Sequence, residues 1–102
     1  MNLKKPNECS SLEEVRDQID SIDKEIIQLL GLRHKYVEKI VRFKKDEEGV
    51  IAAARKDFVI QQRANWAAQS GADPETIRKL YTLLIDRNIQ HELKLLRERI
   101  KN

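Results

Sequence analysis

The sequence predicts an all-α fold, and three observations support this. Charged residues make up 36% of the chain and aromatic residues 5%, which is typical of a helical protein with long solvated faces. Only three glycines and two prolines are present, so few positions would interrupt a helix. Apolar residues recur three and four positions apart over long segments, as on one face of a helix. We expect one domain, residues 1–102, made of a short leader at 1–10 and three helices at about 11–44, 53–69 and 74–100.

The first predicted helix begins at two overlapping capping boxes, Ser10 with Glu13 and Ser11 with Glu14. Its apolar stripe continues to Phe43 without a proline. At 1.5 Å per residue the helix would be a rod of about 50 Å, whereas a compact chain of this size has a radius of gyration of about 13 Å. We therefore expect a second chain to cover the rest of the stripe, in a homodimer. A plain coiled-coil spacer is the alternative.

Local signals bound the second and third helices. Gly49 and the acidic residues before it indicate a break ahead of the second helix, and Gly71 is expected to end that helix. Asp73 is the predicted N-cap of the third helix, with Pro74 at its first position. Trp66, on the second helix, is assigned to the core.

Composition and motifs argue against several functional classes. The net charge is +3 with both signs mixed along the chain, so nucleic acid is not an expected partner. No segment has the roughly 20 apolar residues of a membrane span, and no signal-peptide pattern is found. Cys9 stands alone, and neither His34 nor His91 has a Cys, an Asp or a second His at metal-binding spacing. We expect a cytoplasmic protein with no metal site and no cofactor.

Three cations interrupt the apolar stripe of the first helix: Arg16, Arg33 and Lys44. A single such residue is usually explained by a stem that packs on the stripe while its charge reaches water. On a continuous helix, however, Arg33 and Lys44 would lie about 16 Å apart on nearly the same face and could hold a small anion between them. Arg16 lies about 25 Å from Arg33, so an antiparallel partner helix would have to bring its own Arg16 to that anion.

Two polar residues, Asn88 and Glu92, lie one turn apart within the apolar face of the third helix. The other members of this face are Ile77, Tyr81, Leu84, Ile85, Leu95 and Leu96. A buried Glu is costly unless it is paired or protonated. Glu92 therefore either forms a structural bridge with Arg33 or Lys44, or belongs to the same anion site. Arg55, at the start of the second helix, points into that site or into water.

The segment VRDQIDSIDKEIIQLLGLR at 15–33, followed by RFK at 42–44, resembles the first helix of the all-helical chorismate mutases, a family that includes the isochorismate-pyruvate lyases. The resemblance covers nearly the whole chain. It implies an intertwined homodimer of three-helix chains with two active sites, and a small dicarboxylate substrate, chorismate or isochorismate. It also implies a pericyclic reaction that needs no nucleophile, metal or general base.

The same resemblance implies roles for the cations on the first helix. Arg16 of one chain and Arg33 of the other would hold the two substrate carboxylates, and Lys44 would lie beside the ether oxygen of the enolpyruvyl side chain. Such a site would fold the dianion into its reactive conformer. It would also stabilise the negative charge left on oxygen as the C–O bond breaks.

The resemblance extends to the second and third helices. Glu92 would donate a hydrogen bond to the same ether oxygen, for which it must be protonated, and Asn88 would contact the substrate. Arg55 matches a further substrate-binding arginine, although Ala54 and Lys56 stand where the bacterial mutases have flanking acids.

Two activities are compatible with this resemblance. The first prediction is chorismate mutase, which rearranges chorismate to prephenate, because Glu92 occurs in some mutases and departs from the lyase pattern. The alternative is isochorismate-pyruvate lyase, which forms salicylate and pyruvate, since the segments PNECSSLEEVR, RFK and QQRANWAAQSG resemble that branch more. A non-catalytic helical dimer that keeps the scaffold is the second alternative.

Overall fold

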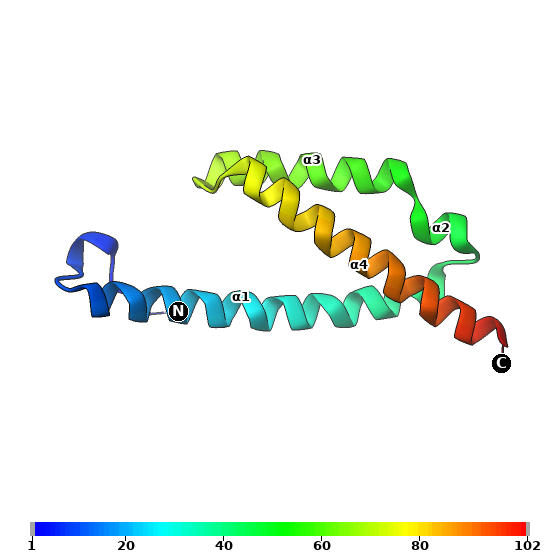
Figure 1. Cartoon of the computed structure of the whole chain (residues 1–102), viewed down its shortest axis with the longest axis horizontal. Coiled ribbons are helices and arrows are strands. Elements are labelled where there is room, and N and C mark those ends of the chain that lie inside the picture. Colours follow the sequence, from blue (N-terminus) through cyan, green and yellow to red (C-terminus); the bar gives the residue numbers. More distant parts are fainter. Residues whose placement is uncertain (1, 102) are drawn as a thin grey trace. The chain divides into compact units, whose positions relative to one another are not determined.

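The computed structural model describes the backbone of residues 2–101 and the side chains of residues 2–99, so Met1 and Asn102, at the ends of the predicted domain, lie outside it. Every regular element in this part of the chain is helical, which confirms the predicted fold class. The elements are a 3₁₀ turn at Pro6–Glu8, α1 (Leu12–Ile40), a 3₁₀ turn at Val41–Phe43, α2 (Glu47–Ile51), α3 (Ala53–Ser70) and α4 (Pro74–Lys101) (Figure 1). None of the described helices is both long and apolar enough to cross a membrane.

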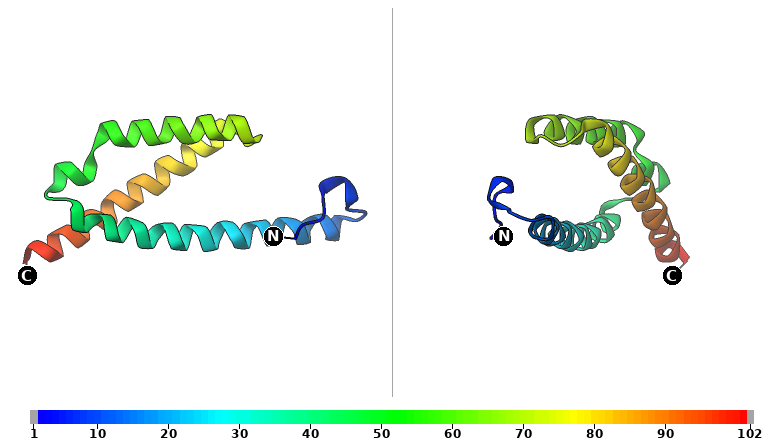
Figure 2. Two further views of the ribbon diagram at one scale, coloured as in Figure 1. Left: turned by 180° about the vertical axis from the view of Figure 1, so that it is seen from behind. Right: turned by 60° about the vertical axis from the view of Figure 1, so that its left-hand side comes forward.

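The chain divides into two compact units, Met1–Lys35 and Tyr36–Asn102. In the first unit the leader doubles back along α1 (Figure 2). The backbone N–H of Lys4 donates to Gln18 Oε1 at 2.9 Å, and the Lys4 ammonium lies 3.3 Å from Glu14 Oε1. Hydrogen bonding and charge therefore tie the leader to the first turns of α1.

Helix α1 begins at Leu12, one residue after the predicted start. Ser11 Oγ accepts the Glu14 N–H at 3.1 Å, as the second capping box predicts. The Ser10 N–H donates to the Glu14 carboxylate at 2.8 Å, so Glu14 takes the place that the first box gives to Glu13. This N–H, together with the Lys4 ammonium, holds the pKa of Glu14 below its usual range.

The apolar stripe of α1 is open to solvent in the chain. None of the residues described in α1 is buried. Ile19, Ile26 and Leu29, which belong to the predicted stripe, are 49%, 47% and 55% exposed. A helix with this much apolar surface is typical of one that packs against another molecule.

Helix α1 ends at Ile40, so the prediction of a helix as far as Lys44 is wrong. Val41 begins a 3₁₀ turn, and Lys44 has an extended backbone with φ −95° and ψ 134°. Their eleven-residue spacing had predicted that Arg33 and Lys44 share one helical face. They do not, because the helix ends between them. The cause is tertiary: Val41 is buried, and Arg99 donates hydrogen bonds to the carbonyl groups of Val41 and Lys44.

The break predicted in the segment around Gly49 lies at Ala52, and α3 begins at Ala53, as predicted. Gly49 is part of the short helix α2, where its N–H donates to the N-cap Asp46 at 2.9 Å. Ala52 then adopts a left-handed backbone, with φ 33° and ψ 64°, and its N–H bonds to the Glu48 carbonyl at 3.0 Å. Left-handed geometry is costly for a residue with a Cβ atom, so an alanine gives no sign of it in the sequence.

Helices α3 and α4 form an antiparallel hairpin in the second unit (Figures 1 and 2). Gly71 ends α3 as predicted, with φ 80° and its N–H bonded to the Ala67 carbonyl. Asp73 caps α4 as predicted, because its carboxylate accepts the Thr76 hydroxyl at 2.6 Å and the Thr76 N–H at 3.1 Å. These two bonds lower the pKa of Asp73.

Polar and aromatic contacts join the two helices of the hairpin. The Lys56 ammonium of α3 pairs with the Asp86 carboxylate of α4 at 2.5 Å. The Arg63 guanidinium lies 4.7 Å from the centroid of Trp66 and 5.7 Å from that of Tyr81. Trp66 is 49% exposed, so its assignment to the core is wrong within this chain: its ring lies against the guanidinium of the half-buried Arg63.

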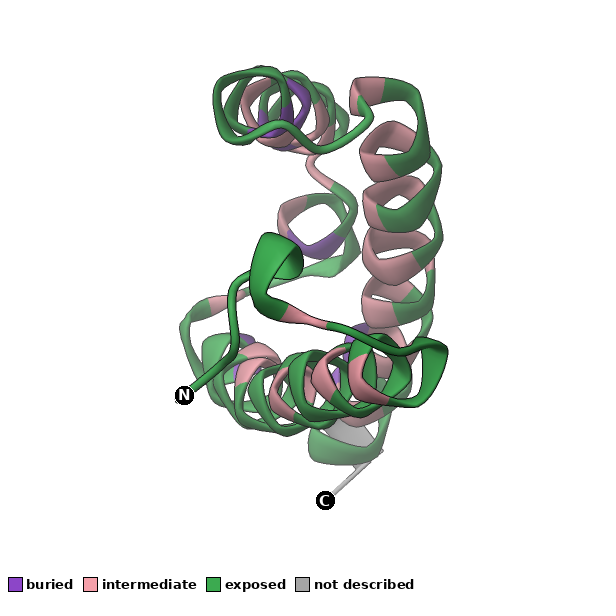
Figure 3. Ribbon diagram, turned by 90° about the vertical axis from the view of Figure 1, so that its left-hand side faces the viewer, coloured by how far each residue is buried: buried purple, intermediate pink, exposed green. Residues whose placement is uncertain are grey.

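The buried residues of the second unit come from α3, from α4 and from the segment between α1 and α3. Helix α3 contributes Val59, Ala64 and Ala67. A separate small cluster consists of Val41, Val50 and Leu96, with Ile89, Leu93 and Leu95 packed against it. The predicted apolar face of α4 is buried or half-buried throughout, and it forms a continuous side of the helix (Figure 3). This face carries both polar residues that the sequence singled out.

Candidate functional site

The two predicted carboxylate-binding arginines lie on α1 in the first unit. Arg16 is exposed and Arg33 is half-buried. At 1.5 Å per residue they are about 25 Å apart along the helix. One chain therefore presents them at two different places.

Lys44 lies in the second unit, in the extended segment between the 3₁₀ turn and α2. Its side chain is half-buried, and the ammonium donates to the Gly49 carbonyl at 3.0 Å. The same glycine donates its N–H to Asp46, the N-cap of α2. Helix α2 therefore fixes the position of Gly49, and the Gly49 carbonyl in turn binds the Lys44 ammonium. The Gly49 bond uses one of the three N–H donors of the lysine.

The backbone of Lys44 is fixed to α4. Arg99 donates from Nη1 to the Val41 carbonyl at 2.9 Å and from Nη2 to the Lys44 carbonyl at 2.7 Å. Val41, which is 4% exposed, packs with the fully buried Leu96 of the same helix. Arg99 is not among the residues predicted from the sequence, because a lone arginine near the end of a charged helix carries no signal of its own.

Glu92 and Asn88 lie on the buried side of α4. Among the described residues Glu92 is the only buried charged one, at 8% exposure, and Asn88, one turn earlier, is half-buried. Leu96, one turn after Glu92, belongs to the core cluster that anchors the segment before Lys44. The carboxyl and the lysine are therefore both attached to the C-terminal half of α4.

Arg55 lies at the start of α3 and is exposed. Its guanidinium is 5.6 Å from the ring centroid of Phe58, one turn later on the same helix. The neighbouring Lys56 pairs with Asp86. The contact found for Arg55 is thus with an exposed ring.

His91 of α4 has an acidic neighbour that sequence spacing did not indicate. Its Nε2 lies 3.0 Å from Glu38 Oε2 on the last turns of α1. This contact joins the end of α1 to α4 within the second unit.

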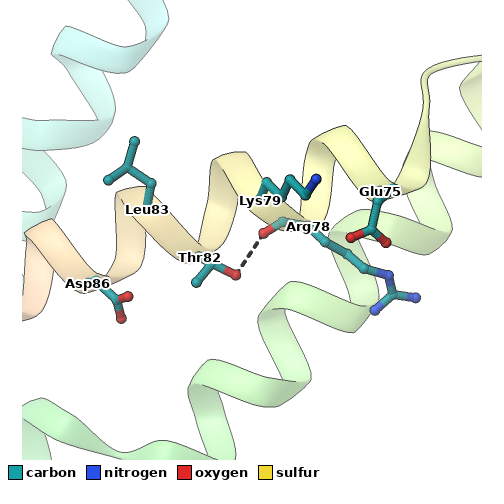
Figure 4. Close-up of a pocket in the computed structure, with 6 residues that line it drawn as sticks. All are labelled: Glu75, Arg78, Lys79, Thr82, Leu83 and Asp86. Carbon is teal, nitrogen blue, oxygen red and sulfur yellow. Dashed lines mark hydrogen bonds between the residues drawn. The ribbon is translucent and has the colours of Figure 1, made fainter.

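A shallow depression of about 390 Å³ lies along the N-terminal half of α4 (Figure 4). Its lining consists of Glu75, Arg78, Lys79, Thr82, Leu83 and Asp86. Two acids face two cations here, so the depression has no excess of positive charge for a dianion. It is also separate from the residues that the sequence predicted.

Comparison with known proteins gives three findings. Residues 15–93 match the family model described as chorismate mutase type II. The chain is 34% identical over 96 residues to the isochorismate pyruvate lyase of Pseudomonas aeruginosa, covering 94% of this chain and 95% of that protein. It is 29% identical over 82 residues to the bifunctional chorismate mutase/prephenate dehydratase of Buchnera aphidicola, covering 79% of this chain but 21% of that protein.

Proposed function

This chain belongs to the chorismate mutase type II family, and from that membership we propose that it is an enzyme that rearranges chorismate to prephenate. The observation that carries the proposal is the joint attachment of Lys44 and Glu92 to one half of α4. One is a half-buried ammonium and the other a buried carboxyl. This is the pair that the reaction needs at the ether oxygen of its substrate.

The proposed mechanism uses hydrogen bonds and charge alone. One C–O bond breaks while one C–C bond forms, and negative charge develops on the ether oxygen. Lys44 would stabilise this charge with one N–H while the Gly49 carbonyl holds another. Protonated Glu92 would donate a second hydrogen bond to the same oxygen. Asn88 would contact the same substrate from one turn away.

The proposed site needs a second copy of the chain. Because Arg16 and Arg33 are about 25 Å apart on one helix, a single substrate would take Arg33 from one chain and Arg16 from its partner. The open stripe of α1, which includes Ile26, is the surface that the partner would cover. We therefore propose a homodimer with two shared sites.

Mixed dimers test the shared site. Arg16→Ala and Arg33→Ala should each be inactive alone, because every site then lacks one arginine. After unfolding and refolding together, random pairing makes about half of the dimers mixed, each with one intact site, so activity should return to about a quarter of wild type. Refolding either variant alone is the control. No recovery in the mixture, although sedimentation shows dimers, would contradict the shared site.

Isochorismate-pyruvate lyase is a second candidate. The observation that favours it is the similarity of the Pseudomonas aeruginosa protein of that name over 94% of this chain. Elimination of pyruvate from isochorismate also breaks a C–O bond at an ether oxygen. The same lysine and carboxyl would serve it, and salicylate would be the second product.

Separate incubations with chorismate and isochorismate decide between these activities. Prephenate from chorismate is the expected result, whereas salicylate and pyruvate from isochorismate alone would assign the lyase. Arg33→Ala should abolish either activity, since it removes a proposed carboxylate contact. Product from neither substrate would leave the non-catalytic helical dimer as the better description.

A further inference from the structure

We propose that Arg99 is a positioning residue for the reaction, because its guanidinium holds the backbone of Lys44 on α4. This inference rests on the proposed function of Lys44. Nη1 of Arg99 donates to the Val41 carbonyl at 2.9 Å and Nη2 to the Lys44 carbonyl at 2.7 Å. The Arg99 guanidinium therefore binds the backbone at the first residue of the 3₁₀ turn and at the residue that follows the turn.

The segment around Lys44 has little regular structure to place it. Helix α1 stops at Ile40 and the backbone of Lys44 is extended, so no helix fixes the position of its Cα. The Lys44 N–H bonds to the Val41 carbonyl at 3.0 Å, which closes the 3₁₀ turn. A carbonyl has two lone pairs, so Val41 accepts this bond together with the one from Arg99. With the Gly49 bond at its ammonium, Lys44 is held at both ends.

Arg99 occupies a particular place on α4 relative to Glu92. Seven residues separate them, which is two helical turns or about 10 Å along the axis and about 20° around it. They therefore lie on nearly the same face of one rigid helix. Because Arg99 binds the Lys44 carbonyl, α4 determines the position of the Lys44 backbone relative to the Glu92 carboxyl. The Lys44 ammonium and the Glu92 carboxyl are both proposed to bind the ether oxygen of the substrate, so the distance between them matters for the rate.

An arginine suits this task better than a lysine would. Its planar guanidinium presents donors in a rigid fork that can satisfy two carbonyl groups at once. Arg97, two residues earlier, offers a matched comparison: its side chain is 61% exposed, and it pairs with Glu47 of α2 at 3.0 Å. It has the same charge and lies about 3 Å along α4 from Arg99, but about 200° around the helix axis, and its partner is a side chain in solvent.

The test compares three variants of the full chain, Arg99→Ala, Arg99→Lys and the control Arg97→Ala, at a temperature where circular dichroism shows each one folded. Displacement of a reacting group by about 1 Å can cost 100-fold, so kcat should fall about 10- to 100-fold in Arg99→Ala. Arg99→Lys should recover part of that loss, since an ammonium can reach one carbonyl at a time. Arg97→Ala should keep wild-type kcat.

Amide hydrogen exchange separates positioning from general stability. In Arg99→Ala the Lys44 N–H should exchange faster, while amides in the α3–α4 hairpin keep wild-type rates. If Arg99→Ala does not fold, Arg99→Lys carries both measurements. Equal kcat in the Arg99 and Arg97 variants would overturn the inference, and so would faster exchange throughout the hairpin. A wild-type protein that converts neither substrate would instead overturn the proposed function.

Discussion

Leu96 is the largest fully buried side chain that the structure describes, so truncating it should cost much of the stability. Leu96→Ala removes three carbon atoms from the cluster with Val41 and Val50. At about 0.8 kcal/mol per buried methylene the transfer loss is about 2.4 kcal/mol, and the cavity left behind brings the cost to about 3 to 5 kcal/mol. Small domains have about 5 to 15 kcal/mol in total, so the variant would lose a large share.

Urea unfolding followed by circular dichroism measures this loss, at one fixed protein concentration for all variants because association would shift the midpoint. Leu83→Ala is the matched control: the same atoms leave the same helix, but Leu83 is 57% exposed, so its cost should stay within about 0.5 kcal/mol. Leu96→Met keeps the volume and should cost less than about 1.5 kcal/mol. A free energy of unfolding no lower in Leu96→Ala than in Leu83→Ala would refute the assigned core.

Three further predictions concern Glu92, Ala52 and Asp73. If Glu92 donates as a neutral acid, the wild-type rate constant should fall as pH rises and Glu92→Gln should flatten the profile; a pH-independent wild-type rate would contradict this role. Ala52→Gly should raise the free energy of unfolding by up to about 1 kcal/mol, because glycine adopts the left-handed backbone without strain. The measurement is the midpoint of urea unfolding, and a midpoint below that of the wild type would contradict this expectation. Because folding lowers the pKa of Asp73, its contribution to stability is present above pH 3.8, the ordinary pKa, and disappears as pH falls through the pKa of the folded state. Asp73→Asn should keep the cap but weaken the dependence of the melting temperature on acid pH.

Signals that act within one or two turns were enough to predict several boundaries. Gly71 ends α3 through its left-handed backbone, and Asp73 begins α4 by accepting hydrogen bonds from a residue three positions later. Both effects depend only on residues within four positions of Gly71 or Asp73 in the sequence. The spacing of apolar residues likewise predicted the buried face of α4, which includes Glu92.

Signals that depend on distant residues were not visible. The end of α1 is set in part by Arg99, 58 residues after the carbonyl of Val41 that it binds. Periodicity alone extended that helix to Lys44, and it therefore gave the lysine a wrong position. The bond from the Lys44 ammonium to the Gly49 carbonyl requires α2, a helix too short to show a periodic pattern. Spacing and resemblance selected the candidate residues, but tertiary contacts determine how Lys44 is held.

The open stripe of α1 also bears on how the first unit folds. An isolated helix gains little from its own backbone bonds, because nucleation is costly and most helical stability in proteins comes from packing. No residue described in α1 is buried, so packing within the chain adds little to the stability of this helix. With a second copy as that surface, ordering α1 becomes a bimolecular step, and the ordered fraction follows total protein concentration. In the proposed homodimer, dilution would then remove the proposed activity by melting a helix, while the side chains proposed to bind substrate stay chemically intact.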